Sequence, residues 1–151
     1  MLREEINTAL KDAMKARKEH RVSTLRLVNA ALKNADLEAQ GRGKSALSDE
    51  EILALLQKLI KQRQEAAELY DKAGRSELAA RERDEIEIIS AYLPQQMSEA
   101  EAKAAIAEAI KTTGATGIKD MGKVMGALKQ GYAGRIDFGK ASSWVKQLLA
   151  G

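Results

Sequence analysis

Apolar residues recur every three or four positions along most of the chain, which is the period of an amphipathic α-helix. The spacing predicts a first helix over residues 2–18 and a second that begins near Arg21 or Ser23 and ends before Gly41. The apolar stripe expected on the first helix consists of Leu2, Ile6, Leu10, Ala13 and Met14. The stripe expected on the second helix consists of Leu25, Val28, Leu32 and Ala35.

Capping residues mark the helix boundaries in the next segment. Ser48 followed three residues later by Glu51 is a capping-box pattern, and it opens the longest predicted helix. Gly74 suits the end of that helix, and Ser76 is the expected N-cap of a fourth helix that Pro94 stops. The expected core positions of the long helix are Ile52, Leu55, Leu56, Leu59, Ile60, Ala66, Ala67 and Tyr70.

The pattern predicts an all-α protein with two domains. The first four helices form a four-helix bundle-like N-terminal domain over residues 1–93. Residues 94–97 are the predicted linker, and a second capping box, Ser98 with Glu101, opens a small three-helix C-terminal domain over residues 98–151. The last two helices of that glycine-rich domain are expected over residues 118–130 and 138–149.

The amino-acid composition limits which fold classes and which cellular compartments are compatible with the sequence. An aromatic fraction of 3% requires an aliphatic core, while one proline and 31% charged residues disfavour a β-sandwich or barrel. The absence of cysteine from the sequence excludes disulfides, thiolate catalysis and cysteine-ligated metal sites. The N-terminus lacks a signal-peptide h-region, and no apolar run reaches the about 18 residues that span a membrane. We therefore expect a cytoplasmic monomer without membrane association.

Few side chains offer catalytic chemistry. The single histidine, His20, lies among charges at a predicted helix boundary, where we expect it to be solvated. The remaining candidates are carboxylates, which we expect to be structural acids that pair with arginines across the bundle. These carboxylates are Glu82, Asp84, Glu85 and Glu87, and the arginines are Arg21, Arg26, Arg63 or Arg75. No nucleophile elbow, P-loop or dinucleotide fingerprint is present. The sequence thus predicts a non-enzyme with no catalytic residue, metal or cofactor.

Residues 121–126 are the most informative for binding. Gly122 and Gly126 are four residues apart, so on a helix they share a face and leave a shallow groove. Lys119 and Lys123 lie near the start of that helix, where free amides and the helix dipole favour an anion. A phosphate backbone fits this combination. The alternative is a glycine groove for tight helix packing, flanked by solvated lysines.

Charge is distributed unevenly along the chain. The net charge is +4 over residues 1–46, −4 over residues 47–97 and +3 over residues 98–151. This asymmetry is typical of a polyanion-facing end and a partner-facing middle, although solvated helix faces give the same pattern. In the basic C-terminal segment, Asp137 is placed to cap the last helix, and Trp144 has the apolar spacing of a core residue rather than a base-stacking one.

Five segments resemble a known family. In order they are Arg21-x-x-x-Leu25-Arg26-Leu27, Tyr70-x-x-Ala73-Gly74-Arg75, Glu82-x-x-Glu85-Ile86, Tyr92-Leu93-Pro94 and Met121-Gly122-Lys123-Val124-Met125-Gly126. The ordered set resembles the YqeY-like family, also called GatB/YqeY domain proteins, over essentially the whole chain. That family is named for its similarity to the C-terminal tail of the B subunit of glutamine-dependent tRNA amidotransferase.

The resemblance implies a helical, tRNA-associated module, because in the larger enzyme the tail is an accessory element that contacts tRNA. A carbon–nitrogen ligase label with glutamine as amido donor is, on this interpretation, inherited from the larger enzyme. The tRNA contacts carry over best to Gly122, Lys123 and Gly126. They carry over less well near Arg135, because the family commonly has small residues at the positions of Ile136 and Phe138.

Two functions therefore remain open. The first is a non-catalytic binding module for tRNA or another structured RNA. The second is a helical adaptor whose acidic middle binds proteins of an amidotransferase or aminoacyl-tRNA synthetase complex. The residues predicted to contact RNA are Lys119, Gly122, Lys123, Gly126, Lys129 and Arg135.

Overall fold

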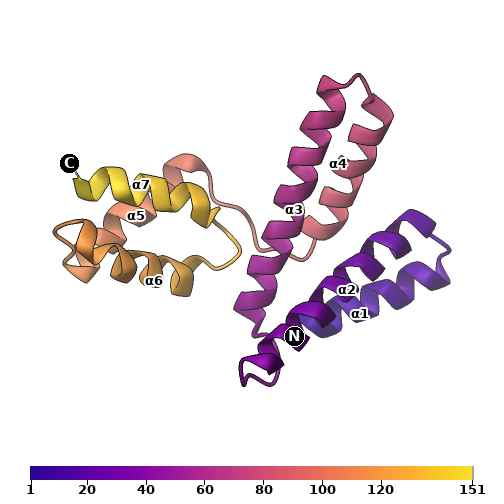
Figure 1. Cartoon of the computed structure of the whole chain (residues 1–151), viewed down its shortest axis with the longest axis horizontal. Helices are drawn as coiled ribbons and strands as arrows, with labels where there is room; N and C mark the ends of the chain where they lie inside the picture. The colour runs from indigo at the N-terminus through magenta and orange to yellow at the C-terminus, as the bar shows by residue number, and fades with distance from the viewer. Residues whose placement is uncertain (151) are drawn as a thin grey trace. The chain divides into compact units, whose positions relative to one another are not determined.

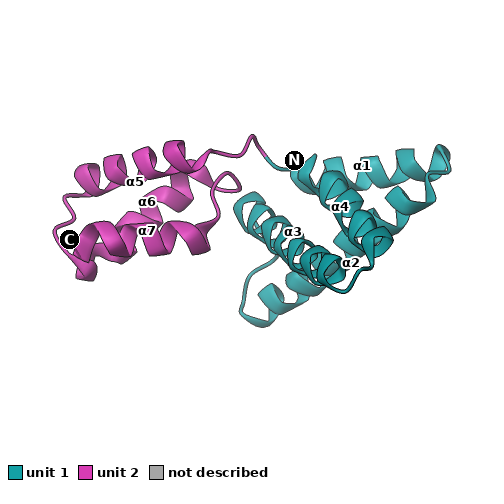
Figure 2. Cartoon of the chain, turned by 90° about the horizontal axis from the view of Figure 1, so that it is seen from above, with its two compact units in different colours: residues 1–93 teal, residues 94–151 magenta. Residues whose placement is uncertain are grey.

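The computed structural model describes residues 1–150, which form seven α-helices and one short 3₁₀ helix without a strand. The all-α prediction is confirmed. The chain divides into two compact units, residues 1–93 and residues 94–151 (Figure 2). Each unit has its own apolar cluster.

The first unit consists of two helical hairpins that pack against each other (Figure 1). One hairpin joins α1 to α2 and the other joins α3 to α4, each through a short turn. Leu56 is fully buried and Leu59 is 7% exposed, as their spacing predicted, whereas Met14 is exposed. The helices are α1 (Leu2–Lys15), α2 (Glu19–Gly41), α3 (Asp49–Lys72) and α4 (Ser76–Ser90).

Local backbone geometry moves two of the predicted helix boundaries. Helix α1 ends at Lys15 rather than at residue 18, because Arg17 adopts a left-handed conformation with φ of 55°. Helix α2 then begins at Glu19, earlier than expected, with that acidic side chain in its first turn, where the helix dipole favours it. Helix α2 also runs through Gly41 rather than ending before it.

The predicted caps around α3 and α4 have different outcomes. Ser48 Oγ accepts a hydrogen bond of 3.2 Å from the backbone N–H of Glu51, so the cap of α3 is confirmed. Gly74 lies just beyond α3 with φ of 73°, the left-handed conformation that glycine adopts without strain. Ser76, however, is the first residue of α4 rather than its cap, and Arg75 precedes it without a side-chain cap hydrogen bond.

Asp36 joins three parts of the first unit. Its carboxylate accepts hydrogen bonds of 2.7 and 2.8 Å from the Arg3 guanidinium of α1. It also accepts a bond of 3.1 Å from the backbone N–H of Leu47 in the loop before α3. The Arg3 hydrogen bonds lower the pKa of Asp36 below its usual value. The bidentate pair therefore fixes α1 and the α2–α3 loop against α2.

The second unit is a three-helix cluster around its own aliphatic core. Ser98 and Glu101 form the predicted reciprocal capping box, with both hydrogen bonds at 3.1 Å. Gly114 ends the first of these helices with φ of 67°. The helical elements are α5 (Glu99–Thr113), the 3₁₀ helix η1 (Ile118–Asp120), α6 (Met121–Tyr132) and α7 (Phe138–Ala150).

The segment predicted as a linker is hydrogen-bonded to the second unit. Met97 N–H donates a 3.0 Å hydrogen bond to the carbonyl of Arg135, and Gln96 Nε2 donates to the carbonyl of Gly134. The Arg135 Nε in turn donates a 3.0 Å bond to the carbonyl of Gln95. Residues 95–97 are thus tied by hydrogen bonds to the loop before α7, within the C-terminal unit.

Candidate nucleic-acid interface

Helix α6 presents two glycines on an open face. Gly122 and Gly126 are both exposed, and a Cβ atom built on either one would meet nothing within 4 Å. Lys129 follows at the next helical step, so it shares their face, and it is also exposed. The opposite side of α6 carries the core residues Val124 and Leu128, both fully buried. The glycines therefore do not serve packing within the second unit.

The lysines beside the glycines differ in their surroundings. Lys119 lies in η1 and Lys123 in the first turn of α6, and both side chains are exposed. Lys123 Nζ lies 3.9 Å from the carboxylate of Asp120, whereas neither Lys119 nor Lys129 has an ion pair within residues 1–150. Two unpaired ammonium groups and one that is loosely paired therefore lie on η1 and α6, and Lys129 is the one on the glycine face.

Asp120 changes the electrostatics at the start of α6. Its carboxylate accepts a 3.0 Å hydrogen bond from the backbone N–H of Thr116, and this bond is the main reason that its pKa is lowered. The charged carboxylate stands where the helix dipole would otherwise favour an external anion. The carboxylate forms no cap hydrogen bond to the first amides of α6, so its effect at this helix start is that of a negative charge beside Lys123.

Arg135 holds the loop between α6 and α7. Beyond its bond to Gln95, its guanidinium carbon lies 5.9 Å from the centroid of the Tyr132 ring, and the residue is half-buried. Ile136 is 2% exposed and belongs to the core, which accounts for a large residue at a position where small ones are expected. Asp137 Oδ1 accepts 2.9 and 3.3 Å bonds from the first-turn amides of α7, so the predicted cap is confirmed.

Trp144 is half-buried against the core of the second unit, as its apolar spacing predicted. The ammonium of Lys103 lies 5.3 Å from the centroid of the indole ring. This cation–π contact occupies a face that a stacked base would need. The structure therefore favours the packing role of Trp144.

The carboxylates of α4 separate into paired and unpaired groups. Glu85 Oε2 lies 3.3 Å from Arg63 Nε, and both side chains are largely buried. This pair realises the structural pairing expected from the sequence. The neighbouring Glu82 is partly buried beside Glu85, and burial together with the charge of Glu85 raises the pKa of the Glu82 carboxyl. Asp84 and Glu87 form no ion pair within residues 1–150.

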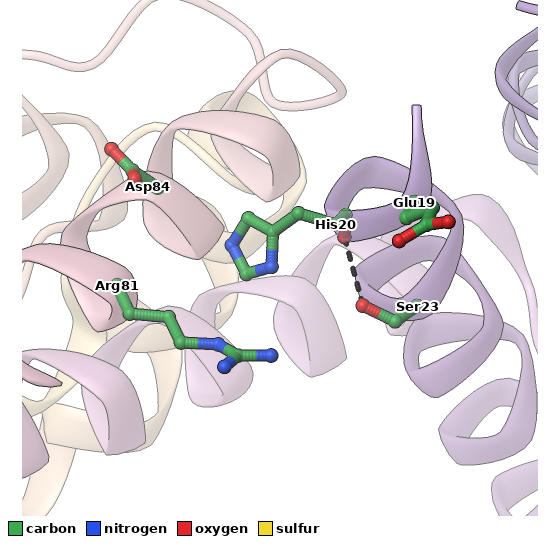
Figure 3. Close-up of a pocket in the computed structure, with 5 residues that line it drawn as sticks. All are labelled: Glu19, His20, Ser23, Arg81 and Asp84. Atoms are coloured by element: carbon green, nitrogen blue, oxygen red, sulfur yellow. Dashed lines mark hydrogen bonds between the residues drawn. The ribbon is translucent and has the colours of Figure 1, made fainter. Parts of the chain in front are cut away.

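His20 contradicts the expectation of a solvated side chain. It lies in the first turn of α2, and its Nε2 atom is buried without a hydrogen-bond partner among the described residues. It lines a groove of about 610 Å³ between α2 and α4, together with Glu19, Ser23, Arg81 and Asp84 (Figure 3). A signal was present in the sequence. His20 precedes the buried residues Thr24, Val28 and Leu32 at steps of four, which places it on the inner face once α2 begins at Glu19.

Within residues 1–150 we looked for groups of metal ligands and for membrane-spanning helices. No three His, Asp or Glu side chains gather there as a group that could hold a metal ion. None of the described helices is both long and apolar enough to cross a membrane.

The sequence matches a protein-family model and is similar to known proteins. The family model described as Yqey-like protein matches residues 3–149. A protein of Lachancea thermotolerans named altered inheritance of mitochondria protein 41, mitochondrial, is 41% identical over 86 residues, which are 57% of this chain and 44% of that relative. The chain thus spans less than half the length of that relative. An uncharacterized protein of Schizosaccharomyces pombe is 32% identical over 93 residues, which are 62% of this chain and 72% of that relative.

Proposed function

The chain belongs to the YqeY-like family, and on that premise we propose that it is a non-catalytic binding module for tRNA. The observation that carries the proposal is the open glycine face of α6. Glycine in a helix interior costs about 0.5–1 kcal/mol relative to alanine, and no close contact within the second unit accounts for Gly122 or Gly126. Their missing side chains would admit a backbone that approaches from outside.

The charge beside this face favours a phosphate backbone as the approaching group. Lys119 and Lys129 are exposed without ion pairs in the described chain, and Lys123 is only loosely held by Asp120. Ammonium groups that neutralise phosphates release counterions, which gives RNA binding a strong dependence on salt. The family resemblance to the tail of the tRNA amidotransferase B subunit supports tRNA as the nucleic acid.

The first prediction tests the glycine face. Gly126→Leu should weaken tRNA binding at least tenfold, because the side chain blocks the approach of the backbone. The fold should be retained or slightly stabilised, since the added atoms meet no neighbour and leucine is the better helix former. Fluorescence anisotropy with labelled bulk tRNA measures the binding, and thermal melts followed by circular dichroism measure the fold.

A matched control comes from the same helix. Gly131 is also exposed and open to a Cβ, but it lies half a turn away from Gly122 around α6, so Gly131→Leu should leave tRNA binding unchanged. Lys123→Ala should lower affinity and reduce the slope of log K against log salt by just under one. Normal tRNA binding by a well-folded Lys123→Ala, Gly126→Leu double variant would contradict the proposed site. Nuclease-resistant recovery of protein partners instead of tRNA would favour the adaptor function.

A further inference from the structure

The groove between α2 and α4 has a composition that the proposed function does not use. Beside the hollow of Figure 3 lies a second one of about 480 Å³, and the two share His20 and Asp84. The second hollow is lined by Lys18, His20, Arg21, Asp84, Glu87 and Ile88. Cations and carboxylates therefore both line these two adjoining hollows on the first unit, which we call the α2–α4 groove.

The charged groups of this groove are not paired with each other. Arg81 and Asp84 are three residues apart on α4, a spacing that commonly forms an ion pair, yet neither has an ion pair within residues 1–150. Arg83 on the same helix shows the contrast, because its guanidinium is paired with Asp71. In Figure 3 the Arg81 side chain extends from α4 toward α2, below the imidazole of His20. These groups are thus available to a ligand.

His20 adds a polar atom whose hydrogen-bonding capacity the protein leaves unused. Leaving a buried polar group unsatisfied costs about 1–3 kcal/mol, and such groups are rare enough in native proteins to need an explanation. The same side chain lines both hollows of the groove. The buried atom without a partner therefore belongs to a side chain that borders the groove.

The shape and lining of the groove indicate a polymer as its occupant. Glu19, Ser23 and Arg81 are exposed, so the groove is open, whereas sites for small molecules enclose most of the ligand. Grooves that bind amphipathic peptide helices are apolar, and Ile88 is the one apolar residue that lines either hollow. An open and polar groove fits an extended polar chain better than either a small molecule or a helical peptide.

Cations near the turn between α1 and α2 indicate that the polymer is negatively charged. Four exposed cations lie on the last two turns of α1 and in this turn, and none of the four has an ion pair in the described part of the chain; one of them, Lys18, lines the groove. They are Lys11, Lys15, Arg17 and Lys18. Such a cluster attracts a polyanion. RNA also carries a 2′-hydroxyl that can donate to a carboxylate, so a groove with both cations and acids matches RNA better than DNA.

We propose that the α2–α4 groove binds a ribose–phosphate segment of RNA, with Arg81 and Lys18 on phosphates and Asp84 accepting a hydrogen bond from a 2′-hydroxyl. The inference rests on the proposed function and adds a second contact surface, on the other unit of the chain. In this arrangement the carboxylate distinguishes ribose from deoxyribose, while the cations supply affinity that depends on salt.

The test uses the full chain with labelled bulk tRNA and with an RNA hairpin and a DNA hairpin of the same sequence. Arg81→Ala should weaken tRNA binding three- to tenfold and flatten its salt dependence, whereas the matched Arg83→Ala should change neither. Asp84→Ala should lower the ratio of RNA to DNA affinity. Removal of a negative charge by itself would instead strengthen the binding of both hairpins equally, and that result would overturn the ribose contact.

His20→Leu separates binding from stability. Because it removes a buried polar atom without a partner, the melting temperature should stay the same or rise, while tRNA binding falls. A lower melting temperature with unchanged tRNA binding would show a purely structural histidine and would overturn the site. If the unmodified chain binds no tRNA, the proposed function fails. If the unmodified chain binds tRNA, Gly126→Leu weakens that binding and Arg81→Ala leaves it unchanged, the groove inference alone fails.

Discussion

At Gly122 and Gly126, α6 has residues of low helix propensity that gain no contact within the second unit. A sequence pattern of two glycines four apart does not separate a packing groove from an external face, because both need a missing Cβ. The structure separates them by the buried positions of Val124 and Leu128 on the opposite side of α6. A second residue of interest at this scale is Glu82, because its surroundings disfavour the charged form of its carboxyl.

Glu82 leads to a prediction about pH. Burial and the charge of Glu85 raise the pKa of Glu82 in the folded protein above its unfolded value. The stability that this carboxyl contributes is therefore fully present below the unfolded pKa of about 4.3 and is lost as pH rises through the raised pKa. Glu82→Gln should raise the melting temperature at pH 7, and the gain should shrink toward pH 4. Melts of the exposed Glu87→Gln variant provide the control, and an equal gain there would contradict the assignment.

At the scale of the elements, helix ends decide which side chains face inward. The left-handed Arg17 ends α1 early and lets α2 begin at Glu19. That start is earlier than either Arg21 or Ser23, and it brings His20 into the first turn of α2 on its inner stripe. The hydrogen bonds of Asp36 then hold α1 and the α2–α3 loop in place.

Asp36→Asn tests this junction of elements. The substitution weakens the hydrogen bonds to Arg3 and Leu47, and since the Arg3 side chain is 35% exposed we expect a loss of about 1–2 kcal/mol. The pKa of Asp36 is lowered in the folded state, so its contribution is present above the unfolded pKa and is lost as pH falls through the lowered value. Urea unfolding at pH 7 and pH 3 should therefore show a smaller difference at pH 3. Exposed Asp12→Asn should change little at either pH.

At the scale of the whole molecule, the two apolar clusters share no residue. One contains Ile6, Leu25 and Leu56, among others, and the second contains Ile106, Val124 and Leu128 with their neighbours. A core that is not shared transmits no packing defect from one unit to the other. Each unit is therefore expected to respond by itself to a substitution in its own core.

Leu59→Ala is the corresponding prediction. Leu59 is 7% exposed in the core of the first unit, so its truncation should cost about 2–5 kcal/mol through lost burial and a cavity. Hydrogen exchange followed by mass spectrometry should show faster exchange confined to residues 1–93. Leu69 is 65% exposed on the same helix, and Leu69→Ala should cost less than about 0.5 kcal/mol. Faster exchange throughout the second unit would contradict two independent cores.

The sequence by itself determined the helical class, the core positions such as Leu25 and Leu56, and the caps at Ser48, Ser98 and Asp137. These features depend on contacts within one or two turns, so local spacing and side-chain chemistry are sufficient to predict them. The paired acid Glu85 was also expected, although its partner was one of four arginines until α3 and α4 were placed together.

Only the tertiary structure decided which side of α6 the glycines face, that residues 95–97 pair with the loop before α7, and that His20 lines a groove. Each of these features depends on residues far apart in the chain, such as Gln95 with Arg135 and His20 with Arg81. Hydrophobic periodicity indicates that a helix has an inner face, but it does not indicate which other element covers that face. The geometry of packed helices supplies that information, because it sets which unpaired charges remain open to a partner.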